Sequence, residues 1–124
     1  KRKSWVVQAR SAYEKRKKQK RSPSYDKLLK ERREALLLQE ENLGMDHVEN
    51  AAIHFDIGTL LKAKGKRKLS LESFWSAVAL LKQAYGKNNI NVAASYCNLA
   101  EVYLMQKDYD RSFRSYKKAL FIHD

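Results

Sequence analysis

The chain has 124 residues, a formal net charge of +12, one proline, four glycines and one cysteine. This length fits one domain and leaves no room for a catalytic cleft between domains, and a lone cysteine excludes an internal disulfide and a thiolate metal site. Because helix breakers are scarce and no apolar run alternates as a strand would, the composition predicts an all-helical protein.

The positive charge is concentrated near the N-terminus. Residues 1–22 contain ten Lys or Arg and one acidic residue, Glu14, which gives this segment +9, whereas the other 102 residues carry +3. Such asymmetry predicts an acidic partner: a nucleic acid, an anionic membrane face or an acidic polypeptide. No segment resembles a signal peptide or reaches the roughly 18 apolar residues that span a bilayer, so we expect a soluble cytosolic or nuclear protein.

Six helices are predicted, and a proline separates the first two. The first helix covers residues 3–20 and ends at residues 21–24, because Pro23 disfavours a helical conformation in the residue before it and suits the first turn of a new helix. The second helix covers residues 25–43 and ends at Gly44. Its apolar side is expected to contain Tyr25, Leu28, Leu29, Ala35, Leu36, Leu38 and Leu43.

The last four helices are bounded by glycines and by capping side chains. They are expected at residues 47–64, 69–85, 89–105 and 109–122. Glycine ends a helix in a left-handed conformation, and Asn or Asp side chains accept hydrogen bonds from a first helical turn. The expected boundary residues are Asp46 or His47, Gly65, Gly86, Asn88 or Asn89, and Asp108. Paired in order, the six helices form three hairpins.

The last two hairpins repeat with a fixed offset of 42 residues. Small residues align with small ones and large apolar residues with large ones. The aligned pairs are Ala93 with Ala51, Leu99 with Ile57, Ala100 with Gly58, Tyr103 with Leu61, Ser112 with Ser70, Tyr116 with Phe74, Ala119 with Ala77 and Leu120 with Val78. A period of about 20 to 50 residues is typical of a solenoid.

These residues resemble the tetratricopeptide repeat family, in which each helix pair carries small and large side chains at set positions. Tyr96, Leu99, Ala100 and Tyr103 stand at the family's first-helix positions, and the 42-residue spacing is similar to the long repeats of the kinesin light chain type. The resemblance covers residues 25–124 and implies a right-handed all-α solenoid of about three antiparallel helix hairpins. Its units are a degenerate first hairpin with a basic N-terminal helix (1–46), a second repeat (47–88) and a third repeat (89–124), which we expect to continue beyond this sequence.

The resemblance also implies a concave face, formed by the first helix of each pair, on which extended peptides or partner helices bind. The implied groove residues are Phe55, Asp56, Thr59, Lys62, Cys97, Asn98, Glu101 and Met105, with Ala52, Ala63, Ala94 and Leu104 beside them. Asn98 stands where related repeats hold a ligand backbone, because an amide both donates and accepts hydrogen bonds. Ala52 and Ala94 replace the cations with which chaperone-binding members clamp a terminal carboxylate, so an internal peptide segment or a helix is the expected ligand.

Two basic clusters are expected to lie side by side at the turns of the first two hairpins. We call them the basic ridge, and they consist of Arg16, Lys17, Lys18, Lys20, Arg21, Lys64, Lys66, Arg67 and Lys68. The ridge is expected to dock an acidic surface, such as a glutamate-rich tail on a cytoskeletal polymer or a phosphate backbone. The alternative is a solvated edge that only aids solubility. Neither cluster contains the aromatic residues typical of proteins that bind single-stranded nucleic acid, which favours protein partners.

The sequence therefore predicts a non-catalytic scaffold for protein–protein interaction. The alternative is a helical module that binds RNA through the N-terminal helix and residues 62–68. No catalytic residue, cofactor or metal is expected, because Cys97 has no nearby His in the pattern and the three His lack ligand spacing. His54 and Ser70 align with packing positions, and Trp75 marks either a lateral contact or ordinary packing. Analogy with long-repeat adaptors places the chain in the cytoplasm, as part of a larger transport, cytoskeletal, microtubule-associated or ciliary assembly.

Overall fold

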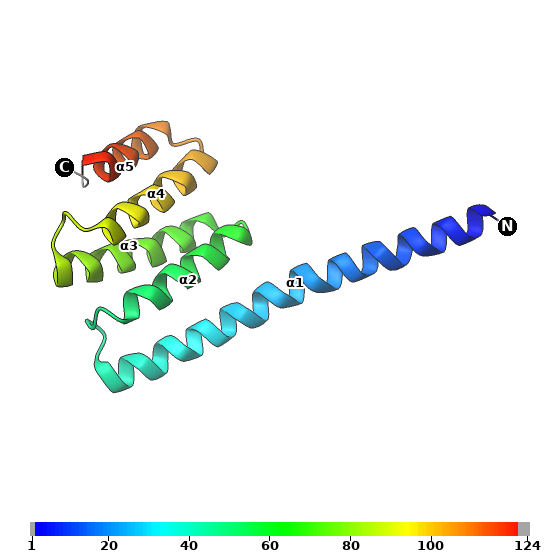
Figure 1. Cartoon of the computed structure of the whole chain (residues 1–124), viewed down its shortest axis with the longest axis horizontal. Coiled ribbons are helices and arrows are strands. Elements are labelled where there is room, and N and C mark those ends of the chain that lie inside the picture. Colours follow the sequence, from blue (N-terminus) through cyan, green and yellow to red (C-terminus); the bar gives the residue numbers. More distant parts are fainter. Residues whose placement is uncertain (1, 122–124) are drawn as a thin grey trace.

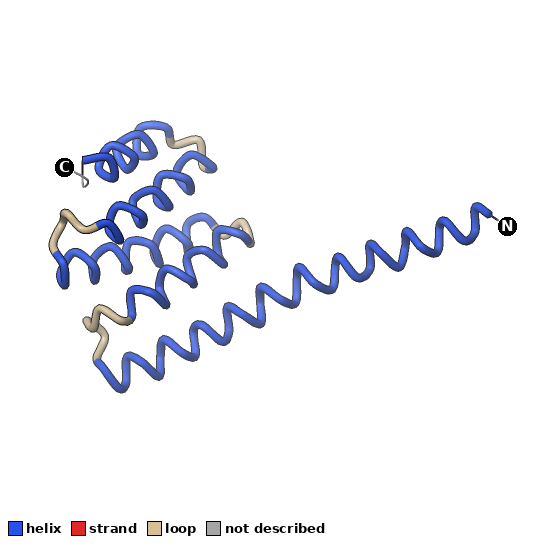
Figure 2. The backbone as a smooth tube through the Cα atoms, viewed as in Figure 1, coloured by secondary structure: helices blue, strands red, loops and turns tan. Residues whose placement is uncertain are grey.

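Five helices make up the part of the chain that the computed structural model describes, namely the backbone of residues 2–121 and the side chains of residues 6–13 and 24–121. They are α1 (Arg2–Leu43), α2 (Asn50–Ala63), α3 (Arg67–Tyr85), α4 (Ile90–Met105) and α5 (Tyr109–Phe121). Each helix packs against the next one along the chain, and the connections alternate between the two ends of the stack (Figures 1 and 2). The predicted all-α solenoid is confirmed.

The first helix departs from the prediction. α1 continues through Pro23, so the expected break at residues 21–24 is wrong and residues 2–43 form one helix instead of a hairpin. Proline costs about 3 kcal/mol inside a helix, but it does not by itself make a turn. Each of the four observed turns contains a residue at positive φ, which is a glycine in three of them, and residues 14–24 contain no glycine. The N-terminal half of α1 therefore extends away from the stack (Figure 1).

The backbone follows the 42-residue offset at several helix boundaries. α1 ends at Leu43 and α3 ends 42 residues later at Tyr85, while α3 begins at Arg67 and α5 begins 42 residues later at Tyr109. The positive-φ residues obey the same spacing, because Gly86 follows Gly44 by 42 positions and Lys107 follows Gly65 by 42 positions. The second half of α1 is therefore the structural equivalent of α3, the second helix of a pair.

Capping residues mark most of the predicted boundaries. The Asn89 side chain accepts a hydrogen bond from the backbone N–H of Asn91 (2.8 Å), and Asp108 accepts one from that of Arg111 (3.3 Å), so both predicted caps are confirmed. α2 begins at Asn50 and not at Asp46 or His47. The buried Asn50 amide donates to the carbonyl oxygens of Gly44 (2.8 Å) and Met45 (3.3 Å), which fixes the loop between α1 and α2.

The buried core has two main parts. Between α1 and α2 the buried residues are Leu29, Ile53, Ile57 and Leu61, and between α3, α4 and α5 they include Phe74, Val78, Val92, Tyr96, Leu99 and Val102. Each large apolar side chain of this kind stabilises the fold by about 1.5 to 3 kcal/mol. Among the described side chains of α1 only Leu29 is buried, and four of the expected inward residues are exposed: Tyr25, Leu28, Leu38 and Leu43. The reason is that α2 is the only helix against which α1 packs extensively in the described part.

Most aligned pairs of the two repeats occupy equivalent buried positions. Ile57 and Leu99, Gly58 and Ala100, Ser70 and Ser112, and Ala77 and Ala119 are all buried, as their alignment predicts. Two aligned pairs differ in burial. Phe74 is 0% exposed, whereas its counterpart Tyr116 is 37% exposed. Val78 is 1% exposed, whereas its counterpart Leu120 is 72% exposed. The difference arises because α4 covers α3, and no described helix lies on the corresponding side of α5.

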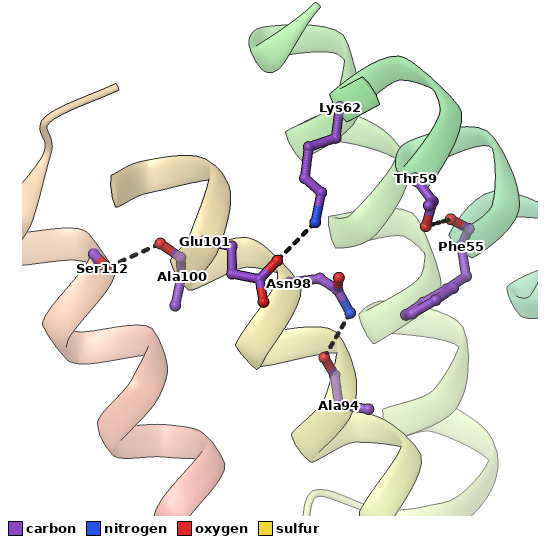
Figure 3. A network of polar contacts seen from close by, with 8 residues as sticks. All are labelled: Phe55, Thr59, Lys62, Ala94, Asn98, Ala100, Glu101 and Ser112. Atoms are coloured by element: carbon purple, nitrogen blue, oxygen red, sulfur yellow. Dashed lines mark hydrogen bonds and ion pairs between the residues drawn. The ribbon is translucent and has the colours of Figure 1, made fainter. Parts of the chain in front are cut away.

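A close approach between α2 and α3 depends on Gly58. A Cβ atom placed there would lie 2.8 Å from Cε1 of Phe74, a distance that side chains do not tolerate. In the next repeat the Ser112 hydroxyl donates to the carbonyl oxygen of Ala100 (2.8 Å), which joins α5 to α4 (Figure 3). Among the described residues, no helix has both the length and the apolar character needed to cross a membrane.

Candidate functional site

The predicted groove residues lie on two neighbouring helices, α2 and α4, and one ion pair joins their faces. Nζ of Lys62 lies 2.6 Å from Oε2 of Glu101 (Figure 3). On α2, Phe55, Thr59 and Lys62 recur at spacings of three and four, so they share one side of the helix. Cys97 and Glu101 are related in the same way on α4. The structure therefore brings the two predicted sets together on one surface, which we call the inner face.

A pocket of about 360 Å³ opens on the inner face between α2, α3 and α4. Its lining residues are Val48, Glu49, Ala51, Ala52, Phe55, Leu81, Tyr85, Asn91, Ala94 and Ser95. Ala52 and Ala94 are exposed, and their methyl groups leave the space that longer side chains would fill. The pocket thus lies toward the N-terminal ends of α2 and α4, and the Lys62–Glu101 pair lies toward their C-terminal ends.

Sequence reasoning missed the contribution of α3 to this pocket. Leu81 and Tyr85 come from the second helix of the pair, which the resemblance assigns to the outer layer. Their spacing of four residues on one side of α3, with Tyr85 directly before the helix-ending Gly86, was the available signal. The apolar part of the lining comes largely from these residues and from Phe55, whose half-buried ring packs edge to face against Phe74 at 5.6 Å.

Two uncharged polar side chains of the inner face, Asn98 and Thr59, are hydrogen-bonded within their own helices. The Asn98 amide nitrogen donates to the carbonyl oxygen of Ala94 (2.9 Å), and the Thr59 hydroxyl donates to that of Phe55 (3.0 Å) (Figure 3). This bond uses one of the two N–H groups of the Asn98 amide, so the other N–H and the amide oxygen stay available for a ligand backbone. Cys97 is half-buried and packs against the core, while Met105 is exposed at the edge of the face.

α1 also reaches the inner face, which the sequence did not indicate. Nη1 of Arg32 lies 3.7 Å from Oδ2 of Asp56, and both side chains are largely exposed. Exposed pairs of this kind contribute about 0 to 1 kcal/mol, so a charged ligand can displace the arginine at little cost. Arg32 occupies a position where the resemblance implies an aromatic residue, and that substitution was the signal for a polar role.

The two clusters of the basic ridge lie in different kinds of secondary structure, one around the α2–α3 turn and the other within α1. Lys66, Arg67 and Lys68 are exposed at the turn between α2 and α3, and Lys64 forms an ion pair with Asp26 of α1. Arg16, Lys17, Lys18, Lys20 and Arg21 belong to α1 and not to a turn, which corrects that expectation, and their side chains lie outside the described residues. The Lys64–Asp26 pair places the α2–α3 turn next to Asp26 of α1. Asp26 lies five residues after Arg21, which is a rise of about 7.5 Å along the helix axis.

Other singled-out residues serve packing. The Trp75 indole N–H donates to the Tyr103 hydroxyl (3.2 Å), and its ring meets that of Tyr96 edge to face at 6.1 Å, which favours the packing explanation for Trp75. Ser70 is buried, as predicted. His54 is half-buried, and burial lowers its pKa from the usual value while Glu40 opposes this effect. His123 lies outside the described residues, within which no three His, Cys, Asp or Glu could hold a metal ion together.

Comparison with known proteins supports the repeat assignment. The sequence model of the family described as tetratricopeptide repeat matches residues 68–122, which is less than half of the chain. Among solved structures, the chain is similar to the crystal structure of BtubC (BKLC) from P. vanneervenii, with a TM-score of 0.77 and 24% sequence identity. That similarity covers 82% of this chain and 40% of BtubC, so the chain spans less than half the length of that protein. No curated protein sequence matches.

These comparisons support two statements. The family match supports tetratricopeptide repeats in residues 68–122, and the structural similarity supports an all-α repeat fold over most of the chain. The assignment to long repeats of the kinesin light chain type stays a prediction. Tetratricopeptide repeats generally mediate protein–protein interactions, and their fold is generally a non-enzymatic scaffold.

Proposed function

We propose that this chain is a non-catalytic scaffold that binds a peptide segment or a helix of another protein on its inner face. The observation that carries the proposal is the 360 Å³ pocket, whose lining is largely apolar but includes Glu49, Asn91 and Ser95. A volume of this size can receive one or two side chains of a ligand, and the small residues Ala52 and Ala94 leave the way open to it. A pocket of this kind recognises a ligand by a few apolar side chains on an otherwise polar segment.

The polar groups around the pocket suit the backbone and the flanks of such a ligand. Asn98 can donate its second N–H to a ligand backbone and accept through its amide oxygen while it keeps the bond to Ala94. Asp56 is held by a long, exposed ion pair, whereas Glu101 is held more closely by the partly buried Lys62, so Asp56 is the carboxylate that can most easily accept a basic side chain of the ligand. The preferred ligand is therefore a mixed segment with an apolar anchor and nearby charges.

The basic ridge supplies a second contact, to an acidic surface of the partner or of its assembly. Lys66, Arg67 and Lys68 are exposed, and none of them has an ion-pair partner within 4 Å among the described residues. The cationic stretch of α1 starts about one and a half turns from the point where the α2–α3 turn meets that helix. A glutamate-rich surface in a cytoskeletal, ciliary or transport assembly fits this charge, and a cytoplasmic location fits such partners.

Site-specific photocrosslinking tests the inner face. A photoreactive amino acid replaces Ala94 in the pocket or, as the matched control, the exposed Ala79 of α3. Crosslinked proteins from a cell extract are then identified by mass spectrometry. The proposal requires a partner that is captured from position 94 and not from position 79. A peptide copy of the crosslinked segment of that partner must also compete with the partner and reduce its crosslinking. Equal capture from both positions, or capture of RNA instead of protein, contradicts it.

A charge reversal tests the ridge separately. The triple variant Lys66→Glu, Arg67→Glu, Lys68→Glu is compared with Lys27→Glu, Lys30→Glu, Arg33→Glu, which makes the same charge change on exposed positions of α1. We expect only the first variant to weaken binding of the crosslinked partner and to flatten its salt dependence. If both variants lower the affinity equally, the ridge contributes through net charge alone and is not a docking surface.

A further inference from the structure

A second pocket, of about 520 Å³, opens between α3, α4 and α5. The residues that matter for its chemistry are Lys82, Lys87, Tyr96, Arg114, Lys117 and Lys118. Tyr96 belongs to α4 and lies two positions after Ala94, which lines the inner-face pocket. Successive residues in an α-helix are rotated by about 100°, so these two side chains leave α4 about 200° apart. The second pocket therefore lies on the opposite side of α4 from the proposed ligand groove.

The lining of this pocket carries charge of only one sign. Five of its lining residues are Lys or Arg, and none of those within the described residues 24–121 is Asp or Glu. The four ion pairs among the described residues use other cations, namely Arg32, Lys62, Lys64 and Arg111. Five cations that surround one hollow repel one another, and a bound anion would relieve that repulsion. The same property makes the pocket attract anions from solution.

One buried ring organises the cations. Nζ of Lys82 from α3 and Nζ of Lys118 from α5 each lie 5.4 Å from the centroid of the Tyr96 ring. Cation–π attraction at this distance stabilises the position of each ammonium group above the Tyr96 ring. The two lysines come from α3 and α5, which are separated in sequence by α4. The rings of Tyr96 and Trp75 also pack against each other edge to face. The cations are themselves exposed, but two of them are placed over a ring that is fixed in the core.

We propose that this pocket binds a compact polyanion that carries several clustered phosphate groups. Its volume lies within the range of small-molecule sites, and Arg114 offers the planar donor pair that matches a phosphate. An extended acidic peptide fits less well, because it spreads its charges along a line of about 3.3 Å per residue while these cations surround one hollow. Stacked nucleobases fit less well too, because Tyr96 is only 3% exposed and two ammonium groups lie over its ring.

Calorimetric titration of the whole chain with defined anions tests the proposal. The probes are inorganic tripolyphosphate, inositol hexakisphosphate and a short glutamate peptide, each at about 0.15 M ionic strength, where long-range attraction is screened. We expect saturable binding of both phosphate compounds with one site per chain, and weaker binding of the peptide. Absence of binding by either phosphate compound, or tighter binding of the peptide, overturns the proposal.

Variants assign the binding to the pocket. Arg114→Gln with Lys118→Gln removes two exposed cations of the pocket, and Lys66→Gln with Arg67→Gln removes the same charge from the ridge. We expect the pocket pair to lower phosphate affinity by about tenfold or more and the ridge pair by less than about twofold. Equal losses in the two variants overturn a specific site. Circular dichroism verifies that both variants keep their helix content.

Clustered phosphates occur both in free molecules and in lipid headgroups. Vesicles with and without phosphatidylinositol bisphosphate, compared with soluble inositol trisphosphate, separate these sources: binding of the soluble compound alone identifies a free anion, and added vesicle binding identifies a headgroup. Binding of neither contradicts a site for inositol phosphates of either source. The pocket does not depend on the proposed ligand groove, so Ala94→Arg should leave phosphate binding unchanged, and a fall in phosphate affinity there would contradict the separation of the two sites.

Discussion

At the scale of single residues, the contact between Gly58 and Phe74 sets how closely α2 and α3 can pack. Replacing glycine by alanine inside an exposed helix usually stabilises it by about 0.5 to 1 kcal/mol. Here the new methyl group would lie 2.8 Å from the Phe74 ring, which is fully buried and packed against Phe55. Because that ring has no room to move, the steric penalty is the larger effect.

We therefore expect Gly58→Ala to lower the free energy of unfolding by about 1 to 3 kcal/mol. Urea denaturation followed by circular dichroism measures the change. The smaller side chain of Phe74→Leu should absorb the added methyl group, so the double variant should lose less than the sum of the single variants. Additive losses would show that the two residues do not share a contact.

His54 gives the fold a dependence on pH. Burial lowers its pKa from the ordinary value of 6.5, and Glu40 raises it by a smaller amount. The unfolded chain therefore binds a proton more readily than the folded chain as the pH falls below 6.5. The contribution of the neutral His54 side chain to the free energy of unfolding is present in full above the pKa of the unfolded chain. It decreases as the pH falls through 6.5 toward the lower pKa of His54 in the folded chain.

We predict that the free energy of unfolding falls between about pH 7.5 and about pH 5.5, and that His54→Gln removes part of this decrease. Chemical denaturation at a series of pH values measures both proteins. The test is the difference between the two pH profiles, because carboxylates elsewhere affect both alike. Parallel profiles would mean that His54 has the same pKa in the folded and unfolded states.

At the scale of elements, α1 combines a packed half with a projecting half. Leu29 anchors the packed half against α2, while the side chains of residues 6–13 are all exposed. The projecting half therefore adds helix without adding core. Its stability must come from helix propensity and from continuity with the packed half, because an isolated helix of this length is marginal in water.

Removal of residues 1–20 should consequently change the free energy of unfolding of the remaining fold by less than about 0.5 kcal/mol. Leu29→Ala, which creates a cavity in the packed half, should lower it by about 2 to 5 kcal/mol and serves as the reference. Thermal and urea denaturation compare the two proteins. A loss of several kcal/mol on truncation would indicate that the N-terminal segment folds back as the first helix of a hairpin.

The helix boundaries show what local sequence can predict. Gly44, Gly65, Gly86, Asn89 and Asp108 mark real ends because the backbone conformation or the capping bond that each supplies is needed locally. Pro23 misled the prediction, because a proline weakens a helix at one point whereas a turn needs residues that adopt positive φ. A strong local signal against helix is not a signal for a hairpin.

At the scale of the whole molecule, the stack presents two different faces on opposite sides of α4. The inner face could be inferred from sequence, because the family resemblance implies which positions of α2 and α4 point inward. The positions of Arg32, Leu81 and Tyr85 beside it depend on how α1 and α3 are placed, which periodicity does not specify. The basic pocket is harder to predict from the sequence than the inner face. Lys82 and Lys118 both lie over the Tyr96 ring only because α3 and α5 are placed on either side of α4.

The central claim is that the inner face of α2 and α4 receives another polypeptide. The most direct measurement is the affinity of the chain for the partner segment captured from position 94, determined by fluorescence anisotropy for Ala94→Arg and for the matched control Ala79→Arg. Both substitutions place the same side chain at an exposed alanine, but only the first fills the inner-face pocket. We predict an affinity loss of about tenfold or more for Ala94→Arg and less than about twofold for Ala79→Arg. Equal affinities of the two variants would contradict the account.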